Sequence, residues 1–312
     1  MSGRSDRHDR TTADDRGRAM NSGLRRRVFH PAKQLLSGML AGLRRELPYL
    51  ELHLVDHCNL RCRGCGHFSS LAPAVFRDLD QYAADLRRLA VLFRNIRRLR
   101  LMGGEPLLHP HAADFITIGR ACFPAADLRF VTNGILLSKA PARFWEACRS
   151  TRTVIDLTVY PLFEAHRDEW RRLCARERVP LNDSPTLDTF HAHMNLKGNT
   201  PPRRAFRSCR SRFYCPFLQA GRLYPCGLPA LAHYFNAKFA ARIPEAEGID
   251  IHAPGLTGRK ILRQLNRPAR TCAWCAETPV AFPWATDGPR AAPCADNWDA
   301  TPRTETDPGI ET

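Results

Sequence analysis

The sequence predicts an α/β fold built on a parallel sheet and followed by a smaller, cysteine-rich α+β region. Two observations support this. Between residues 50 and 178, short apolar segments alternate with segments of helical periodicity, which is the pattern of βα units with parallel strands. After about residue 185 the helical segments become short, Pro and Gly become frequent, and a second group of cysteines begins.

Four strands and four helices are expected in the first part. The strands span residues 50–56, 96–102, 127–132 and 154–160, and the helices span residues 80–94, 112–122, 142–149 and 164–178. In the first helix, Tyr82, Leu86 and Leu89 recur on one face. Parallel connections bring the loops after the strands to one end of the sheet, where such folds bind ligands. Four residues lie at or near these strand ends: Cys58, Gly103, Asn133 and Thr158.

Composition excludes some classes of protein. The chain has 312 residues, of which 44% are hydrophobic, enough for a buried core. Its formal charge of +16 suits anionic partners, but no compact basic block with interleaved aromatic residues is present, so we do not expect a nucleic-acid partner. No apolar run approaches about 18 residues, and the N-terminus lacks a hydrophobic signal segment. We therefore expect a cytoplasmic protein without a membrane partner.

Four parts are expected along the chain. Residues 1–30 and the acidic tail, residues 296–312, are polar, and a low hydrophobic content is typical of disorder. Residues 45–190 are expected to form the parallel-sheet domain, and residues 200–295 the cysteine-rich domain.

Three cysteines at the spacing C-x3-C-x2-C form the first candidate site. Cys58, Cys62 and Cys65 follow the first strand, in a chain whose 12 cysteines are expected to be reduced. Thiolates hold iron–sulfur clusters, and three of them leave one iron of a 4Fe–4S cluster open to a chelating ligand. The alternative is a zinc site with His57 or His67 as fourth ligand. These histidines could instead tune a cluster through hydrogen bonds.

A second motif, Gly103-Gly104-Glu105-Pro106, ends the second strand 38 residues after Cys65. Glycines allow a backbone to approach a ligand closely. With both motifs in this order, the sequence resembles the radical S-adenosylmethionine superfamily. The resemblance implies a partial (βα)6 barrel that binds a 4Fe–4S cluster and S-adenosylmethionine.

The resemblance also implies the residues that bind S-adenosylmethionine. In the family the GGEP segment lines the pocket for the amino group, an Asn-Gly ending is common on the third strand, and a Ser or Thr near the ribose often ends the fourth. The residues implied here are Gly103, Gly104, Glu105, Pro106, Asn133 and Thr158. The chain departs from the family at Gly64, where an aromatic residue usually stacks near the adenine. Phe68 or a residue elsewhere is then expected to supply that contact.

A radical reaction follows from the resemblance. The open iron chelates S-adenosylmethionine, one electron cleaves the sulfonium bond, and the 5′-deoxyadenosyl radical abstracts a hydrogen atom from the substrate. The cofactors supply this chemistry, while the protein positions the groups and excludes water. A flavodoxin or ferredoxin is the expected electron donor.

Five further cysteines follow the first domain: Cys209, Cys215, Cys226, Cys272 and Cys275. Residues 215–226 are expected to form a β-hairpin that turns at residues 220–222. The set resembles the twitch domain, a shortened SPASM extension, which implies one auxiliary 4Fe–4S cluster. Cys209, Cys226, Cys272 and Cys275 are its implied ligands, whereas Cys215 is either a fifth candidate ligand or a free catalytic thiol. A structural zinc site is the alternative.

The resemblance favours a small polar substrate. Twitch-bearing relatives include dehydrogenases and epimerases of sugars, aminoglycosides or aminocyclitols in natural-product and antibiotic biosynthesis. In a dehydrogenase the auxiliary cluster accepts an electron, and in an epimerase a thiol such as Cys215 or Cys294 returns a hydrogen atom. Modification of a ribosomal peptide is the alternative, but the first fifty residues are too short and polar for a peptide-recognition domain. A zinc-binding module without catalysis is a third hypothesis.

Overall fold

The computed structural model describes residues 45–209, 215–245, 248–288 and 291–301. The expected disordered segment 1–30 and residues 302–312 of the expected tail lie outside the described residues.

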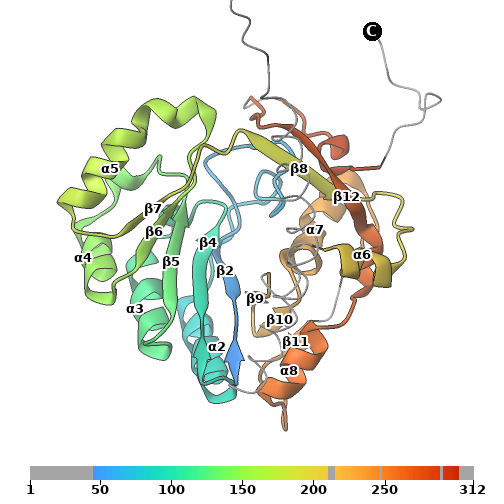
Figure 1. Ribbon diagram of the computed structural model, residues 1–312, viewed down its shortest axis with the longest axis horizontal. Coiled ribbons are helices and arrows are strands. Elements are labelled where there is room, and N and C mark those ends of the chain that lie inside the picture. Colours follow the sequence, from blue (N-terminus) through green and yellow to red (C-terminus); the bar gives the residue numbers. More distant parts are fainter. Residues whose placement is uncertain (1–44, 210–214, 246–247, 289–290, 302–312) are drawn as a thin grey trace, which may run out of the picture.

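A mixed sheet of eight strands forms the centre of the molecule (Figure 1). Its six neighbouring strands from β9 to β7 run parallel, and β10 and β11 extend it in antiparallel fashion. In spatial order the strands are β11 (Ile249–Asp250), β10 (Arg222–Tyr224), β9 (Phe217–Gln219), β2 (Leu50–Val55), β4 (Arg98–Gly103), β5 (Asp127–Thr132), β6 (Val154–Leu157) and β7 (Leu181–Asp183). A separate short pair joins β1 (Glu46–Leu47) to β3 (Asn95–Ile96). The predicted parallel α/β fold is confirmed.

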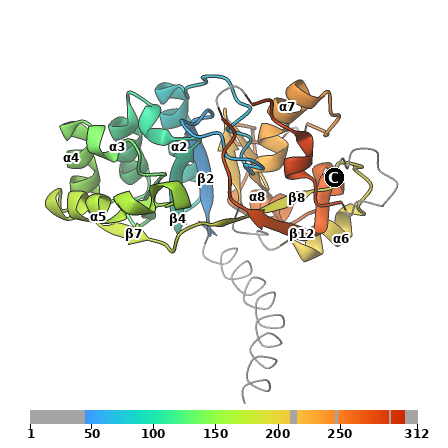
Figure 2. The same cartoon turned by 90° about the horizontal axis from the view of Figure 1, so that it is seen from above.

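Four helices cover one face of this sheet (Figure 2). Apolar side chains of the strands, such as Leu101 and Phe130, pack with apolar residues of the helices in one buried core. Along β5 buried and half-buried residues alternate, so every second side chain points to the opposite face. The helices are α2 (Leu79–Leu92), α3 (Ala112–Cys122), α4 (Ala142–Thr151) and α5 (Arg167–Arg176), with a 3-10 segment, η3 (Pro161–His166), before the last.

The cysteine-rich region continues the same sheet. Strands β9 and β10 form the predicted hairpin, and Ala220 and Gly221 turn the chain with φ values of 46° and 73°. Two residues with positive φ are typical of a tight hairpin turn that matches the twist of its strands. Because β9 pairs with β2, the hairpin lies beside the first strand of the barrel. This region also contains α6 (Pro202–Ser208), α7 (Gly227–Phe239) and α8 (Gly258–Leu265).

A two-stranded ribbon lies next to the sheet at the level of its carboxyl ends (Figure 1). Strand β8 (Thr189–Met194) pairs antiparallel with β12 (Cys275–Pro283). The 3-10 segment η5 (Ala295–Trp298) follows, and the Trp298 side chain is buried against Phe68 and Phe235. The expectation of disorder from residue 296 is therefore wrong for residues 296–301, because this indole completes a small apolar core.

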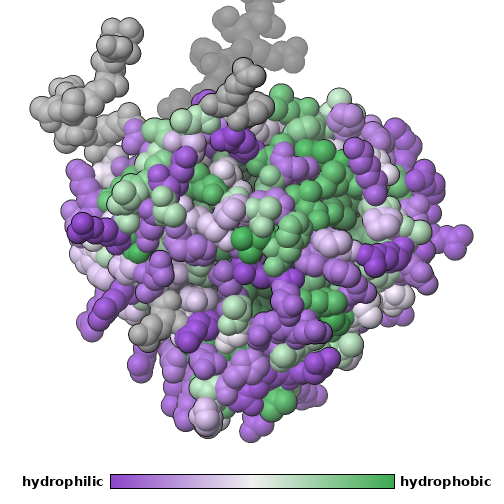
Figure 3. Space-filling model, turned by 180° about the vertical axis from the view of Figure 1, so that it is seen from behind, coloured by the Kyte–Doolittle hydropathy of each residue, from purple (hydrophilic) through white to green (hydrophobic). Residues whose placement is uncertain are grey.

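Figure 3 shows the molecule from behind. On this side the surface is largely polar, and the apolar side chains are concentrated in the upper right part of the view. Within the described ranges, the helices are too short or too polar to cross a membrane.

Candidate functional site

Cys58, Cys62 and Cys65 lie in the loop that leaves the carboxyl end of β2. Burial, together with the charge of the nearby Cys65, raises the pKa of the Cys62 thiol to about 12. Burial also raises the pKa of Cys58, to which the charges of Glu105, Cys65 and Cys62 add. Three half-buried to buried thiols that repel one another as thiolates require a cationic partner, and iron–sulfur clusters are held by such sulfur ligands. The donor set therefore fits a cluster with one open iron.

The zinc alternative would need His57 or His67 as its fourth ligand. The Nδ1 atom of His67 contacts Nε2 of His53 at 2.7 Å, so one ring nitrogen of His67 already has a partner.

Gly103 and Gly104 bring the end of β4 against the backbone of β2 and the cysteine loop. The amide of Gly104 donates to the Val55 carbonyl at 3.1 Å, and the amide of Glu105 donates to the His57 carbonyl at 3.1 Å. A Cβ at Gly103 would collide with the Val55 carbonyl, and one at Gly104 would collide with the His57 carbonyl. The two glycines thus allow close approach of two backbones at the strand ends.

The Glu105 carboxylate ties the carboxyl ends of β4 and β5 together. It accepts hydrogen bonds from the Thr132 hydroxyl at 2.8 Å, the Asn133 amide at 2.9 Å and the Leu107 amide at 3.1 Å. Burial raises its pKa to about 7, although these three donors favour the ionised form. Pro106 begins the short 3-10 segment η1 (Pro106–Leu108), which turns the chain away from this point.

Asn133 and Thr158 also lie at these strand ends. The Asn133 side chain donates to Asn59 at 2.7 Å and lies 3.7 Å from the Cys58 sulfur. The Thr158 amide donates to the Thr132 carbonyl at 2.9 Å. The structure thus brings the implied cofactor-binding residues together beside the first cysteine group.

A buried polar network around Asp56 connects the end of β2 and the cysteine loop to neighbouring segments. The Asp56 carboxylate accepts hydrogen bonds from His53, Arg77 and Tyr234, and His53 contacts His67 through its second ring nitrogen. Burial opposes ionisation of Asp56, but the hydrogen bond from His53 and the charges of His53 and Arg77 hold its pKa well below the usual range. The ionised carboxylate therefore stabilises the fold above its ordinary pKa, and this contribution is lost as the pH falls towards the lowered value.

We expect Asp56→Asn to lower the free energy of unfolding by about 3–5 kcal/mol, because the half-buried Arg77 and the buried His53 would lose the fully buried carboxylate that they contact. Urea unfolding of the metal-free protein at pH 7 measures this. Asp114→Asn, which changes an exposed carboxylate paired with His111, is the control and should cost less than about 1 kcal/mol. A loss at Asp56 no larger than that of the control would contradict the role of the network.

Gly64 lies against the C-terminal region. Its φ is +63°, and an added Cβ would collide with the Asn297 carbonyl and lie 2.6 Å from the Phe282 ring. Phe282, from β12, thus fills the space beside the position where the resembled family has an aromatic residue. Phe68 packs inside a core with Phe235 and Trp298 and is 1% exposed, so its ring is not available for the adenine contact considered above.

We expect Gly64→Ala to weaken the cysteine loop, because a left-handed backbone costs a residue with a Cβ about 1–2 kcal/mol before the collision with Phe282 is counted. Iron retained after reconstitution and desalting measures the effect and should fall by more than half. Gly66→Ala is the matched control, since a Cβ there has no neighbour within 4 Å. Equal iron in both variants would show that the loop tolerates the change.

The second cysteine group also converges. Burial raises the pKa of Cys226, and the charges of Cys275, Cys209 and Cys272 act on it in addition. Burial likewise raises the pKa of Cys215, which Glu51, Cys226 and Cys209 influence. The charges of these thiols thus act on one another, which places the five in one neighbourhood. Cys226 lies at the amino end of α7, and Cys275 begins β12. Cys294 is exposed.

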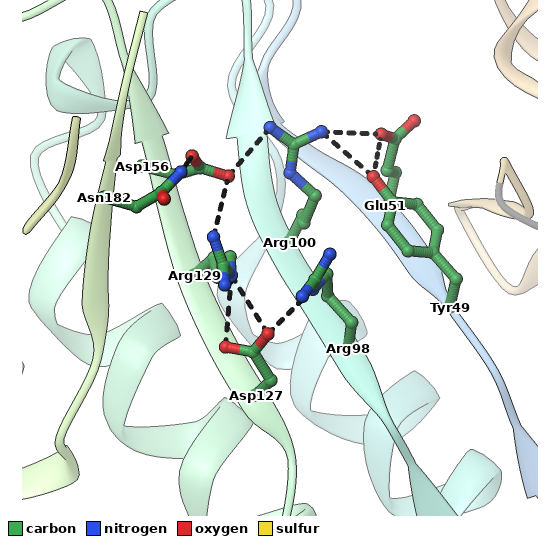
Figure 4. Close-up of polar contacts among 8 residues, drawn as sticks. All are labelled: Tyr49, Glu51, Arg98, Arg100, Asp127, Arg129, Asp156 and Asn182. Carbon is green, nitrogen blue, oxygen red and sulfur yellow. Dashed lines mark hydrogen bonds and ion pairs between the residues drawn. The ribbon is translucent and has the colours of Figure 1, made fainter. Parts of the chain in front are cut away.

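The face of the sheet opposite the helices carries a charged network that our sequence predictions missed (Figure 4). Arg100 is at its centre and contacts Asp156 at 3.1 Å, Glu51 at 3.3 Å and the Tyr49 hydroxyl at 3.0 Å. The alternation of charged and apolar residues along β4 and β5 could have indicated this face, because alternate side chains of a strand point to opposite faces of the sheet. The other members drawn in Figure 4 are Arg98, Asp127, Arg129 and Asn182.

Comparison with known proteins assigns the first domain. Residues 52–182, from β2 to β7, match the family model described as Radical SAM superfamily. The chain therefore contains a radical SAM domain. Members of this superfamily bind a 4Fe–4S cluster and S-adenosylmethionine. The parallel strands β2, β4, β5, β6 and β7 of the sheet form the partial barrel of this domain.

Several curated enzymes are similar to parts of this domain. GTP 3',8-cyclase of Nostoc sp. (strain PCC 7120 / SAG 25.82 / UTEX 2576) is 30% identical over 105 residues, which cover 33% of this chain and 32% of that enzyme. GTP 3',8-cyclase of Stenotrophomonas maltophilia (strain R551-3) is 30% identical over 148 residues, 46% of this chain and 43% of that enzyme. The chain thus matches about a third to less than half of the length of these relatives.

A solved structure described as BtrN in complex with AdoMet and 2-DOIA overlaps with 73% of this chain and 92% of its own, at 18% identity and a TM-score of 0.42.

Proposed function

We propose that this protein is a radical S-adenosylmethionine enzyme that removes a hydrogen atom from a carbon of a small polar molecule, such as a sugar, aminoglycoside or aminocyclitol, and completes a dehydrogenation or an epimerisation. One observation carries the proposal. The charged network around Arg100 lies on the sheet face that a ligand would meet, and its member Glu51 also lies near Cys215 of the second cysteine group. Such a face suits a substrate rich in hydroxyl and amino groups.

The residues of the strand ends would hold the cofactors. Cys58, Cys62 and Cys65 would ligate the cluster, and the segment from Gly103 to Pro106, with Asn133 and Thr158, would bind S-adenosylmethionine. When bound, these groups supply one-electron cleavage of the sulfonium bond and hydrogen-atom abstraction. Glu105 acts indirectly, because its carboxylate already accepts three internal hydrogen bonds. The protein's part is to fix these strand ends and keep water from the reacting atoms. A flavodoxin or ferredoxin would deliver the electron.

The second cysteine group would complete the reaction. Cys209, Cys226, Cys272 and Cys275 fit an auxiliary 4Fe–4S cluster, since their thiols influence one another within a small volume. In a dehydrogenation this cluster would take up the second electron. In an epimerisation the Cys215 thiol would instead return a hydrogen atom, and its place beside Glu51 puts it next to the charged face.

A second candidate function is a radical cyclisation of a nucleotide. The 30% identity of the first domain to enzymes named GTP 3',8-cyclase favours it.

The test is anaerobic purification and reconstitution, followed by assay of 5′-deoxyadenosine release. Release that rises at least tenfold with an aminocyclitol or sugar, and not with GTP, supports the proposal. Release that rises with GTP alone replaces it with the cyclisation. Purified protein without iron or labile sulfide after reconstitution would contradict both.

A further inference from the structure

A segment that follows β12 pairs with the first cysteine loop. The amide of Arg63 donates to the Ala285 carbonyl at 3.0 Å, and the amide of Asp287 donates to the Arg61 carbonyl at 2.9 Å. Cys62 and Thr286 form the antiparallel bridge between these two hydrogen bonds. The Arg63 and Asp287 side chains add an ion pair at 2.6 Å. The C-terminal region therefore forms one wall of the cluster site.

Trp284 stands at the start of this pairing and points its polar edge at a cysteine. Its indole nitrogen, Nε1, lies 3.3 Å from the Cys62 sulfur, and the bond is buried. The ring stacks on Tyr160 with a centroid distance of 4.7 Å and an angle of 11° between the planes. The backbone is held as well, because the Trp284 amide donates to the Asp188 carbonyl at 2.7 Å. The stack and the backbone hydrogen bond together hold the Trp284 ring beside Cys62.

We propose that Trp284 sets the reduction potential of the cluster held by Cys58, Cys62 and Cys65, by donating an indole N–H hydrogen bond to the Cys62 sulfur. The inference rests on the part of the proposed function that assigns these three thiolates to the cluster. It concerns the readiness of that cluster to accept its electron and holds for any substrate.

The sign of the effect follows from charge. A reduced cluster carries one more negative charge than an oxidised one, and part of that charge lies on the thiolate sulfurs. An N–H dipole with its positive end at the sulfur therefore stabilises the reduced form more. Burial strengthens the interaction, because little water screens it. Hydrogen bonds to the sulfurs are among the factors that set cluster potentials. Trp284 thus raises the potential.

Trp284→Phe removes the N–H and keeps an aromatic ring for the stack on Tyr160. We expect the ratio of reduced to oxidised cluster at a fixed potential to fall about tenfold, which corresponds to a shift of about 59 mV to lower potential for one electron. A potentiometric titration followed by electron paramagnetic resonance measures it. The S-adenosylmethionine cluster is identified as the signal that changes when S-adenosylmethionine is added.

Trp298→Phe is the matched control. Its indole N–H also contacts the loop, at 2.8 Å, but the acceptor is the Cys65 carbonyl and not a sulfur. This variant should keep a potential close to that of the wild type. Equal shifts in both variants, no shift in Trp284→Phe, or a shift to higher potential would overturn the proposal. Iron content is measured in the same samples, so that absence of the cluster is recognised separately as failure of the ligand assignment.

A second measurement answers the question if Trp284→Phe does not keep its cluster. Wild-type protein is produced in cells supplied with tryptophan labelled at the indole nitrogen. Its electron paramagnetic resonance should show a hyperfine coupling between this nitrogen and the reduced S-adenosylmethionine cluster, because Nε1 of Trp284 lies 3.3 Å from the Cys62 sulfur. A spectrum without that coupling would overturn the proposal.

Discussion

Replacing Cys58, Cys62 and Cys65 together with Ala is expected to lower the iron content of the reconstituted protein from about eight to about four atoms per chain and to abolish 5′-deoxyadenosine release. The three thiols lie in one loop at the end of β2, and the charges that help to raise the pKa of Cys58 and Cys62 include those of their partners in this loop. The remaining irons would be those of the second group. Iron, labile sulfide and nucleoside release are measured on the same preparation.

Cys122→Ala is the control for this variant. Cys122 ends α3 and is half-buried, away from both cysteine groups. It should keep all of the iron and the release. If the triple variant kept about eight irons, the first loop would not be the cluster site, and if the wild type bound zinc without sulfide, the zinc alternative would replace the radical assignment.

Local periodicity made most of the first domain predictable. The helix at residues 112–122 and the strand at residues 127–132 were expected with the bounds that the structure shows. Each of these elements buries one face, so its apolar residues recur with the period of a helix or a strand, and this period can be read from the sequence. The strand ends could be predicted to meet because parallel connections permit little else. Cys58, Gly103 and Asn133 are close together for that reason.

Contacts between distant segments could not be predicted in the same way. Trp284 is 222 residues from Cys62, and neither segment contains a sequence pattern that predicts its contact with the other. Trp298 was assigned to a polar tail because its neighbours are polar, yet its indole fills a small core and anchors the loop. The alternation of charge along β4 and β5 revealed a polar face but not that Arg100 joins Glu51 to Asp156. Pairing depends on how the strands are aligned, which composition does not fix.

The second group allows a prediction that separates its two roles. Cys272→Ala combined with Cys275→Ala should remove about four irons and leave the first cluster, since two of four ligands would be missing. Release of 5′-deoxyadenosine should continue, but product should fall at least a hundredfold if the reaction is a dehydrogenation. Iron content, nucleoside release and product formation are compared in one assay.

Cys215→Ala is the informative counterpart. The Cys215 thiol lies near Cys226 and Cys209 and also near Glu51, so both a ligand role and a free-thiol role can be tested. If it is a free thiol that returns hydrogen, the variant keeps about eight irons and loses epimerised product, and the wild type incorporates deuterium from heavy water. If the variant loses about four irons instead, Cys215 is a ligand, and one of the other four cysteines becomes the free thiol. Full iron with unchanged product would remove Cys215 from the mechanism and leave electron transfer to the auxiliary cluster as the step that completes the reaction.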